Sequence, residues 1–132
     1  MHPRRRRIIA RDGHDVHRGH GRQLLVRPVR HRLELAVALK GPDTYIATPD
    51  GELFQYSTGK VGLATSGSGD VLAGIALGLL ARGATAEQAG SWAVYLHGEA
   101  GNNLGRSIGP VGFLARELLP EIPKLMKSIS RR

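Results

Sequence analysis

The chain has 132 residues, of which 41% are hydrophobic, so it suits one domain with an ordinary core. It has no cysteine, which excludes disulfide frameworks and thiolate metal sites, and no apolar run approaches the ~20 residues of a membrane-spanning helix. The formal net charge is +8, and residues 1–32 account for all of it, with ten arginines against two aspartates. We therefore expect a cytoplasmic protein whose basicity belongs to a segment and not to the domain.

Residues 1–32 are predicted to form a poorly ordered basic segment ahead of a folded domain at 33–128. The arginines repel one another, and the stretch offers little apolar surface to offset the entropy cost of ordering. An arm of this kind can bind nucleic acid through the phosphates. However, no aromatic residue precedes Tyr45, so base-stacking platforms are absent, and we favour a solvated tail over a nucleic-acid partner.

Three short strands are predicted next. Apolar residues alternate over 33–39, and two further β runs cover 44–48 and 53–56. Turns rich in glycine, proline and aspartate separate them. This pattern predicts an antiparallel hairpin or meander.

Three helices are predicted after residue 62. Residues 70–81 are apolar on nearly all sides, so this helix is expected to be buried in a larger body. Thr85 and Gln88 have the spacing of a capping box for a second helix. Its buried face is expected to hold Ala89, Trp92, Ala93, Leu96 and Ala100. A third helix is predicted at 111–119, interrupted by the two prolines that follow it.

The glycine-rich turn at residues 65–70 opens the most apolar helix. Free N–H groups and the positive dipole end of a helix bind phosphate, and Gly67 and Gly69 let a ligand approach the backbone. Asp70 would then lie beside a bound nucleotide, where a carboxylate can accept a proton or orient a metal ion. The alternative is a flexible turn with Asp70 as a helix cap, and the turn alone does not decide between them.

The chain from about residue 33 to 126 resembles the C-terminal half of the ADP-dependent NAD(P)H-hydrate dehydratases, of the ribokinase-like superfamily. The matching stretches occur in the family's order at residues 39–44, 47–51, 62–75, 95–98 and 112–123. The resemblance implies an α/β fold that is the C-terminal portion of a three-layer ribokinase-like domain. The N-terminal half of a complete member, which supplies further strands and part of the substrate pocket, has no counterpart here.

The resemblance also implies a chemistry. Family members use ADP to dehydrate hydrated NADH and NADPH, by phosphorylating the hydrate's hydroxyl and losing it as phosphate, which leaves AMP. Mg²⁺ is expected to shield the phosphates, and ATP is the alternative nucleotide. Asp70 matches the catalytic residue at the substrate hydroxyl. The residues implied to bind the nucleotide are Lys40, Gly41, Pro42, Asp43, Thr44, Gly67, Ser68 and Gly69.

Other interpretations stay open. Lys40 could be a solvated surface lysine, and Thr44 could be present only because β-branched residues suit a strand. His97 is expected to be a structural histidine and not a catalyst. For the whole chain, the alternatives are a ribokinase-like small-molecule kinase and a non-catalytic remnant.

Without the family's N-terminal half, we expect exposed sheet edges and apolar patches. Such surfaces favour aggregation, self-association or partner binding. We expect a truncated gene, in which residues 1–32 come from a shifted reading frame or a wrongly assigned start.

Overall fold

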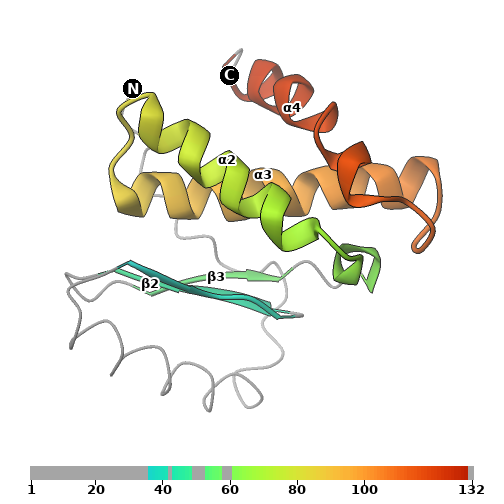
Figure 1. Cartoon of the computed structure of the whole chain (residues 1–132), viewed down its shortest axis with the longest axis horizontal. Helices are drawn as coiled ribbons and strands as arrows, with labels where there is room; N and C mark the ends of the chain where they lie inside the picture. Colours follow the sequence, from blue (N-terminus) through green and yellow to red (C-terminus); the bar gives the residue numbers. More distant parts are fainter. Residues whose placement is uncertain (1–35, 42, 49–52, 58–60, 131–132) are drawn as a thin grey trace. The chain divides into compact units, whose positions relative to one another are not determined.

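The computed structural model describes residues 36–41, 43–48, 53–57 and 61–130 (Figure 1). The chain divides into two compact units, Met1–Ser57 and Thr58–Arg132. The described part of the first unit is a small sheet, and that of the second unit is a group of helices, so the chain contains both element types of the α/β class. The predicted basic segment at 1–32 lies outside the described residues.

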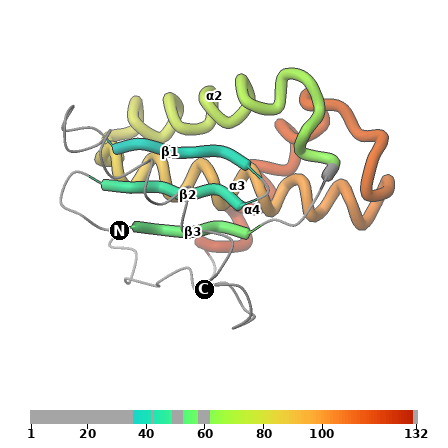
Figure 2. Tube along the Cα trace, turned by 90° about the horizontal axis from the view of Figure 1, so that it is seen from below, coloured from blue at the N-terminus to red at the C-terminus, as the bar shows by residue number. Residues whose placement is uncertain are grey.

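The sheet has three antiparallel strands in the order β1-β2-β3, which lie side by side in Figure 2. They are β1 (Val37–Leu39), β2 (Asp43–Ala47) and β3 (Leu53–Ser57). Tyr45 of β2 pairs with Leu39 on one side and with Gln55 on the other, so β2 is hydrogen-bonded along both edges. The predicted meander is confirmed, because the connections are far shorter than the dozen or more residues that a parallel crossover needs.

The second unit is built around its longest helix. A 3₁₀ turn, η1 (Val61–Ala64), leads into α2 (Ser68–Ala81), α3 (Ala86–Ser107), the 3₁₀ turn η2 (Ala115–Leu118) and α4 (Glu121–Ser130). The central helix α3 contacts each of the other four elements, and α2 lies across it (Figure 1). Among the described residues, no helix is both long and apolar enough to cross a membrane.

The start of α3 is the predicted capping box. The Gln88 N–H donates to Thr85 Oγ1 at 3.2 Å, and the Thr85 N–H donates to Gln88 Oε1 at 3.1 Å. Most of the predicted face is also confirmed, because four of its members are buried: Ala89, Ala93, Leu96 and Ala100. Trp92 is half-buried and meets Tyr95 edge to face, with ring centroids 5.8 Å apart.

The helix predicted at 111–119 is wrong. Only the single turn η2 lies in that stretch, and the α-helix begins at Glu121. Pro123 is the third residue of α4, where a backbone N–H has no intrahelical acceptor, so proline removes no hydrogen bond there. Pro120 and Pro123 therefore mark the beginning of a helix instead of interrupting one.

The core of the second unit depends on close approaches to two glycines. Its buried members are Leu63, Ala100, Leu104, Phe113 and Leu118. A Cβ on Gly101 would lie 2.6 Å from Leu63 Cδ2, and a Cβ on Gly62 would lie 2.5 Å from Phe113 Cε1. Both distances are shorter than atomic contact allows. Larger residues at these two positions would therefore push the core apart.

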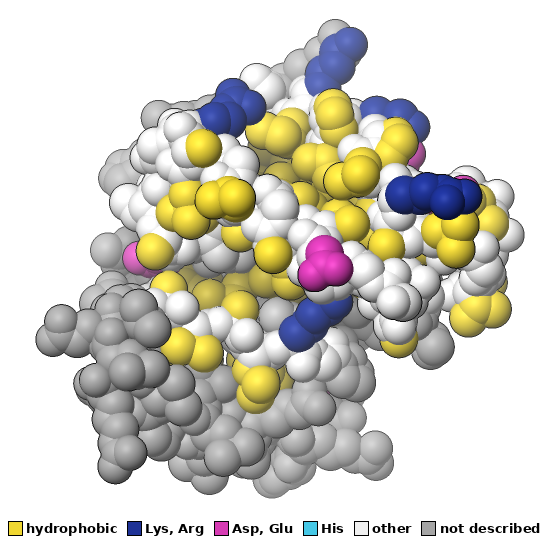
Figure 3. Space-filling model, in the orientation of Figure 1, with side chains coloured by type: hydrophobic (Ala, Val, Ile, Leu, Met, Phe, Trp, Pro, Cys, Tyr) yellow, Lys and Arg dark blue, Asp and Glu magenta, His cyan; other side chains and the backbone are white. Residues whose placement is uncertain are grey.

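Helix α2 is less covered than its composition predicts. Its main contacts are with α3 and η2, and Ser68 is the one buried residue of its length. Leu77 is 67% exposed and Leu80 44% exposed, and Figure 3 shows hydrophobic side chains gathered over α2 and α4. The expectation of a helix buried in a larger body is wrong for this chain, whereas the expected exposed apolar patch is confirmed.

Two glycines in helix interiors give a matched test of this packing. Alanine is favoured over glycine in a helix by about 0.5–1 kcal/mol, and nothing lies within 4 Å of a Cβ on Gly74. We expect Gly74→Ala to raise the free energy of unfolding by about that amount. Gly101→Ala should instead lower it by about 1–3 kcal/mol, because the new methyl meets Leu63. Thermal unfolding measures both, and an equal gain in the two variants would contradict the close packing.

Candidate functional site

Helix α2 begins at a glycine and not at a capping side chain. Gly67 is the N-cap residue, with φ +82° and ψ −8° in the left-handed region, and no side chain caps the helix. The Ser68 N–H donates to the Thr65 carbonyl at 3.2 Å. The N–H groups of Gly69 and Asp70 have no acceptor among the described residues. Two backbone donors therefore remain at the positive end of the helix, which is the arrangement that binds anions.

Asp70 lies in the first turn of α2 with an exposed side chain. The alternative that Asp70 caps the helix is wrong, because Gly67 occupies the N-cap position and no side chain bonds there. Within the described part of the chain, no hydrogen bond or ion pair holds this carboxylate. It is thus available to accept a proton from a ligand hydroxyl, or to share a cation with a bound phosphate.

A magnesium ion fits this arrangement only together with a phosphate. Mg²⁺ keeps several waters and is usually held by one or two carboxylates plus the substrate's phosphate oxygens. The described residues contain no group of three His, Asp or Glu side chains that could hold a metal ion alone. Asp70, one exposed carboxylate beside two free N–H groups, matches the metal–phosphate arrangement.

Ser68 and His97 form a buried pair behind the turn. His97 Nε2 lies 2.9 Å from Ser68 Oγ and 2.9 Å from the Ser68 carbonyl oxygen. The two residues are 1% and 3% exposed. The hydroxyl of Ser68, predicted to be a ligand-binding residue, is therefore directed to His97 and not to the surface. His97 has hydrogen-bond partners inside the protein, as a structural histidine requires.

Lys40 and Gly41 lie between β1 and β2 in the first unit. Gly41 occupies the bend, and Lys40 is exposed directly after β1. Partial burial lowers the pKa of the Lys40 amine below its ordinary value. Pro42, the third predicted residue of this segment, lies outside the described residues.

Asp43 and Thr44 begin β2 and are used by the sheet. The Ser57 hydroxyl donates to Asp43 Oδ1 at 2.5 Å. These two residues also pair in the sheet, so the bond joins the start of β2 to the end of β3. Thr44 is 5% exposed and pairs with Tyr56. The structure thus favours the strand role for the Thr44 side chain.

The predicted site residues therefore fall into two groups. Lys40, Gly41, Asp43 and Thr44 belong to the first unit, whereas residues 67–70 belong to one turn of the second unit. The structure brings the members of each group together. Of the second group, Gly69 and Asp70 present free N–H groups, Gly67 sets the backbone direction, and Ser68 anchors the turn.

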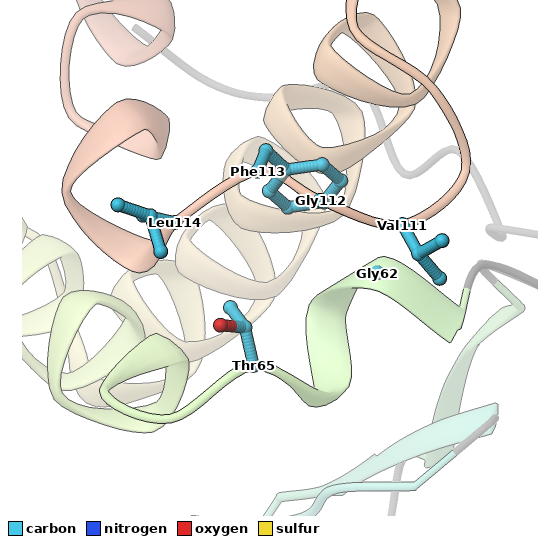
Figure 4. Close-up of a pocket in the computed structure, with 6 residues that line it drawn as sticks. All are labelled: Gly62, Thr65, Val111, Gly112, Phe113 and Leu114. Carbon is cyan, nitrogen blue, oxygen red and sulfur yellow. The ribbon is translucent and has the colours of Figure 1, made fainter.

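A cavity of about 320 Å³ opens beside this turn, and sequence reasoning missed it. Its walls are Gly62, Thr65, Val111, Gly112, Phe113 and Leu114 (Figure 4). The Thr65 side chain points toward the 112–114 segment and is the polar side chain of the lining. The volume is at the lower end of the ~300–1,000 Å³ found for small-molecule sites. Two segments almost 50 residues apart form it, so no local pattern could have indicated it.

The comparisons with known proteins identify the family of this chain. A family model described as NAD(P)H-hydrate dehydratase matches residues 10–124. The chain belongs to this family. The match begins well before residue 33, where the motif resemblance starts, so part of the basic segment is included in it. The family assignment also confirms the expected fold class.

Individual relatives cover most of this chain. The ADP-dependent (S)-NAD(P)H-hydrate dehydratase of Xanthomonas campestris is 46% identical over 100 residues, which are 76% of this chain and 35% of that protein. The bifunctional NAD(P)H-hydrate repair enzyme of Moorella thermoacetica is 40% identical over 96 residues, or 73% of this chain and 18% of that protein.

A solved structure matches over a similar stretch. It is the ADP/ATP-dependent NAD(P)H-hydrate dehydratase of Bacillus subtilis, co-crystallised with ATP and Mg²⁺. Its TM-score is 0.76 at 34% identity, covering 81% of this chain and 39% of that chain. The chain thus spans well under half the length of each of these family members.

The glycines of the turn have different roles, which two alanine variants can separate. Gly67 has a positive φ that costs an L-residue about 1–2 kcal/mol, so we expect Gly67→Ala to lower the free energy of unfolding by that amount. Gly69 has no positive φ and nothing within 4 Å of its Cβ position, so Gly69→Ala should leave stability unchanged or slightly higher. Thermal unfolding measures both, and equal losses would show that Gly67 is not needed for its backbone angle.

Proposed function

We propose that this chain provides the nucleotide-binding turn of an ADP-dependent NAD(P)H-hydrate dehydratase. The observation that carries the proposal is the start of α2, where the free N–H groups of Gly69 and Asp70 adjoin an exposed carboxylate. A phosphate of ADP accepts from these two donors and gains from the helix dipole. Family membership supplies the reaction, because the relatives above carry that activity in their names.

Asp70 acts as the general base in this proposal. It takes the proton from the hydroxyl of the hydrated nicotinamide nucleotide while that oxygen attacks the terminal phosphorus of ADP. The phosphorus–oxygen bond to AMP breaks, so AMP is released. The phosphorylated oxygen then leaves its carbon as inorganic phosphate, and a proton leaves the neighbouring carbon, which restores NADH or NADPH. Mg²⁺, when bound, neutralises phosphate charge.

Lys40 supplies positive charge to the nucleotide phosphates. A lysine ammonium binds phosphate as a point charge, and the resemblance of residues 39–44 to the family's nucleotide-binding segment supports that role. The side chains of Asp43 and Thr44 are engaged in the sheet, and the nucleotide-binding role that the resemblance implies for these two residues stays a prediction. ATP is the alternative nucleotide. A cytoplasmic location and self-association both stay predictions.

The other functions considered have less support. The small-molecule kinase alternative would place the same turn in another branch of the superfamily, but the family match is to the hydrate dehydratases. The nucleic-acid-binding alternative depends on the basic segment, which lies outside the described residues. The nucleic-acid alternative gives no role to the exposed carboxylate beside two free N–H groups.

The proposal is tested by titrating ADP with Mg²⁺ into the folded chain in a calorimeter. We expect Lys40→Ala to weaken ADP binding about 10- to 100-fold, which corresponds to losing one charged hydrogen bond. Lys127→Ala, at an exposed lysine of α4, is the matched control and should bind like the original chain. A folded chain that does not bind ADP would overturn the proposal.

Asp70→Asn separates binding from chemistry. The amide keeps the size of the side chain but cannot act as a base, so ADP affinity should change by no more than a few-fold. Turnover of hydrated NADH should fall by about 10²–10⁴, the usual contribution of general base catalysis. Restoration of NADH absorbance measures the rate. Unchanged turnover in the variant would exclude Asp70 as the base.

The lowered pKa of Lys40 gives a pH signature for ADP binding. In the free chain, burial makes the amine lose its proton at a lower pH than an ordinary lysine. A bound phosphate favours the ammonium, so the complex holds more protons than the free chain at a pH just below the ordinary lysine pKa. ADP binding should therefore take up protons at that pH, and Lys40→Ala should abolish the uptake. Calorimetry in two buffers of different ionisation enthalpy measures it; no uptake in the original chain would place Lys40 away from the phosphates.

A further inference from the structure

We propose that His97 is a positioning residue for the anion-binding turn, acting through Ser68 on the two residues that follow it. This inference rests on the proposed function for what the turn binds. It goes beyond that function by assigning a role to a buried imidazole on another helix.

The hydrogen-bond geometry determines which nitrogen of His97 carries a proton. A carbonyl oxygen can only accept, so the contact of 2.9 Å to the Ser68 carbonyl requires a hydrogen on Nε2. The Ser68 hydroxyl oxygen lies at the same distance from Nε2 and can share that hydrogen. One N–H of α3 therefore holds the first residue of α2 by both its main chain and its side chain.

This contact fixes the residue from which the free donors project. Ser68 is the first residue of α2, and Gly69 and Asp70 follow it directly. The helix has no capping side chain, and its N-cap glycine has wide conformational freedom. The turn therefore needs a restraint from outside the helix. The buried pair of Ser68 and His97 provides one that reaches it from α3.

Burial makes the contact strong and specific. Both residues are nearly inaccessible to water, and an unmade hydrogen bond in such surroundings leaves a costly unsatisfied group. A turn held in advance also loses less conformational freedom when a ligand binds. The expected consequence of losing His97 is a looser turn with weaker anion binding.

Three variants separate positioning from simple stability. His97→Leu removes the donor and keeps similar bulk, whereas His97→Gln retains a side-chain N–H with nearly the same reach. Leu125→Ala is the control for lost stability, because it truncates a half-buried side chain packed against the core from α4. The strong contacts of α4 are with α3 and η2, and not with α2.

The first measurement needs no ligand. The Val71 N–H donates to the Gly67 carbonyl at 3.1 Å and reports whether the first turn of α2 is closed. We expect its hydrogen exchange to accelerate about tenfold in His97→Leu, the equivalent of one hydrogen bond. Exchange in His97→Gln and Leu125→Ala should stay close to that of the original chain when all are folded. Equal acceleration in His97→Leu and Leu125→Ala would overturn the inference.

The second measurement is the affinity for ADP with Mg²⁺, at a temperature where all variants are folded. His97→Leu should bind about tenfold more weakly, His97→Gln should recover most of that loss, and Leu125→Ala should bind normally. Unchanged affinity in His97→Leu would overturn the inference. If the original chain does not bind ADP, the proposed function fails, while the exchange of Val71 still decides whether His97 positions the turn.

Discussion

The close contact between Leu63 and Gly101 is the constraint on which the helical unit depends. A side chain at residue 101 would occupy the space of the Leu63 methyl groups, so η1 can lie on α3 only because that position is glycine. Phe113 makes the same demand of Gly62. The two contacts hold the segment before α2 between α3 and the irregular segment at residues 110–114. Gly62 and Phe113 also form part of the wall of the cavity beside Thr65.

The chemistry of the turn follows from what the fold leaves unpaired. Gly67 occupies the N-cap position but has no side chain to accept a hydrogen bond from the first turn. Two backbone N–H groups therefore stay available. The Asp70 carboxylate lies next to these N–H groups. A substrate hydroxyl or a phosphate-bound cation would therefore meet it if a phosphate bound there. Ser68 and His97 are buried and hydrogen-bonded to each other, whereas Gly69 and Asp70 are exposed. The proposed base, Asp70, therefore has an exposed side chain next to a residue that is anchored from within the protein.

The exposed leucines of α2 contrast with the apolar character of that helix. The relatives are more than twice as long, and this chain matches about 35% of the Xanthomonas protein. A helix that is apolar on nearly all sides suits a domain that covers it on all sides. Here α3 and η2 are its main neighbours, so Leu77 and Leu80 face solvent. The sequence of α2 thus matches the family fold better than it matches the described part of this chain.

Local patterns in the sequence determined the strand order, the Thr85 capping box, the family and the turn that opens α2, because each depends on neighbours along the chain. The helix predicted at 111–119 was wrong because prolines allow both an end and a start, and only the packing of α4 selects the start. The identity of the residue at 68 could not reveal that its hydroxyl is buried, since His97 lies 29 residues away. Tertiary structure alone decided that Ser68 is anchored to α3 by His97, because hydrogen bonds across helices depend on three-dimensional packing that no local spacing records.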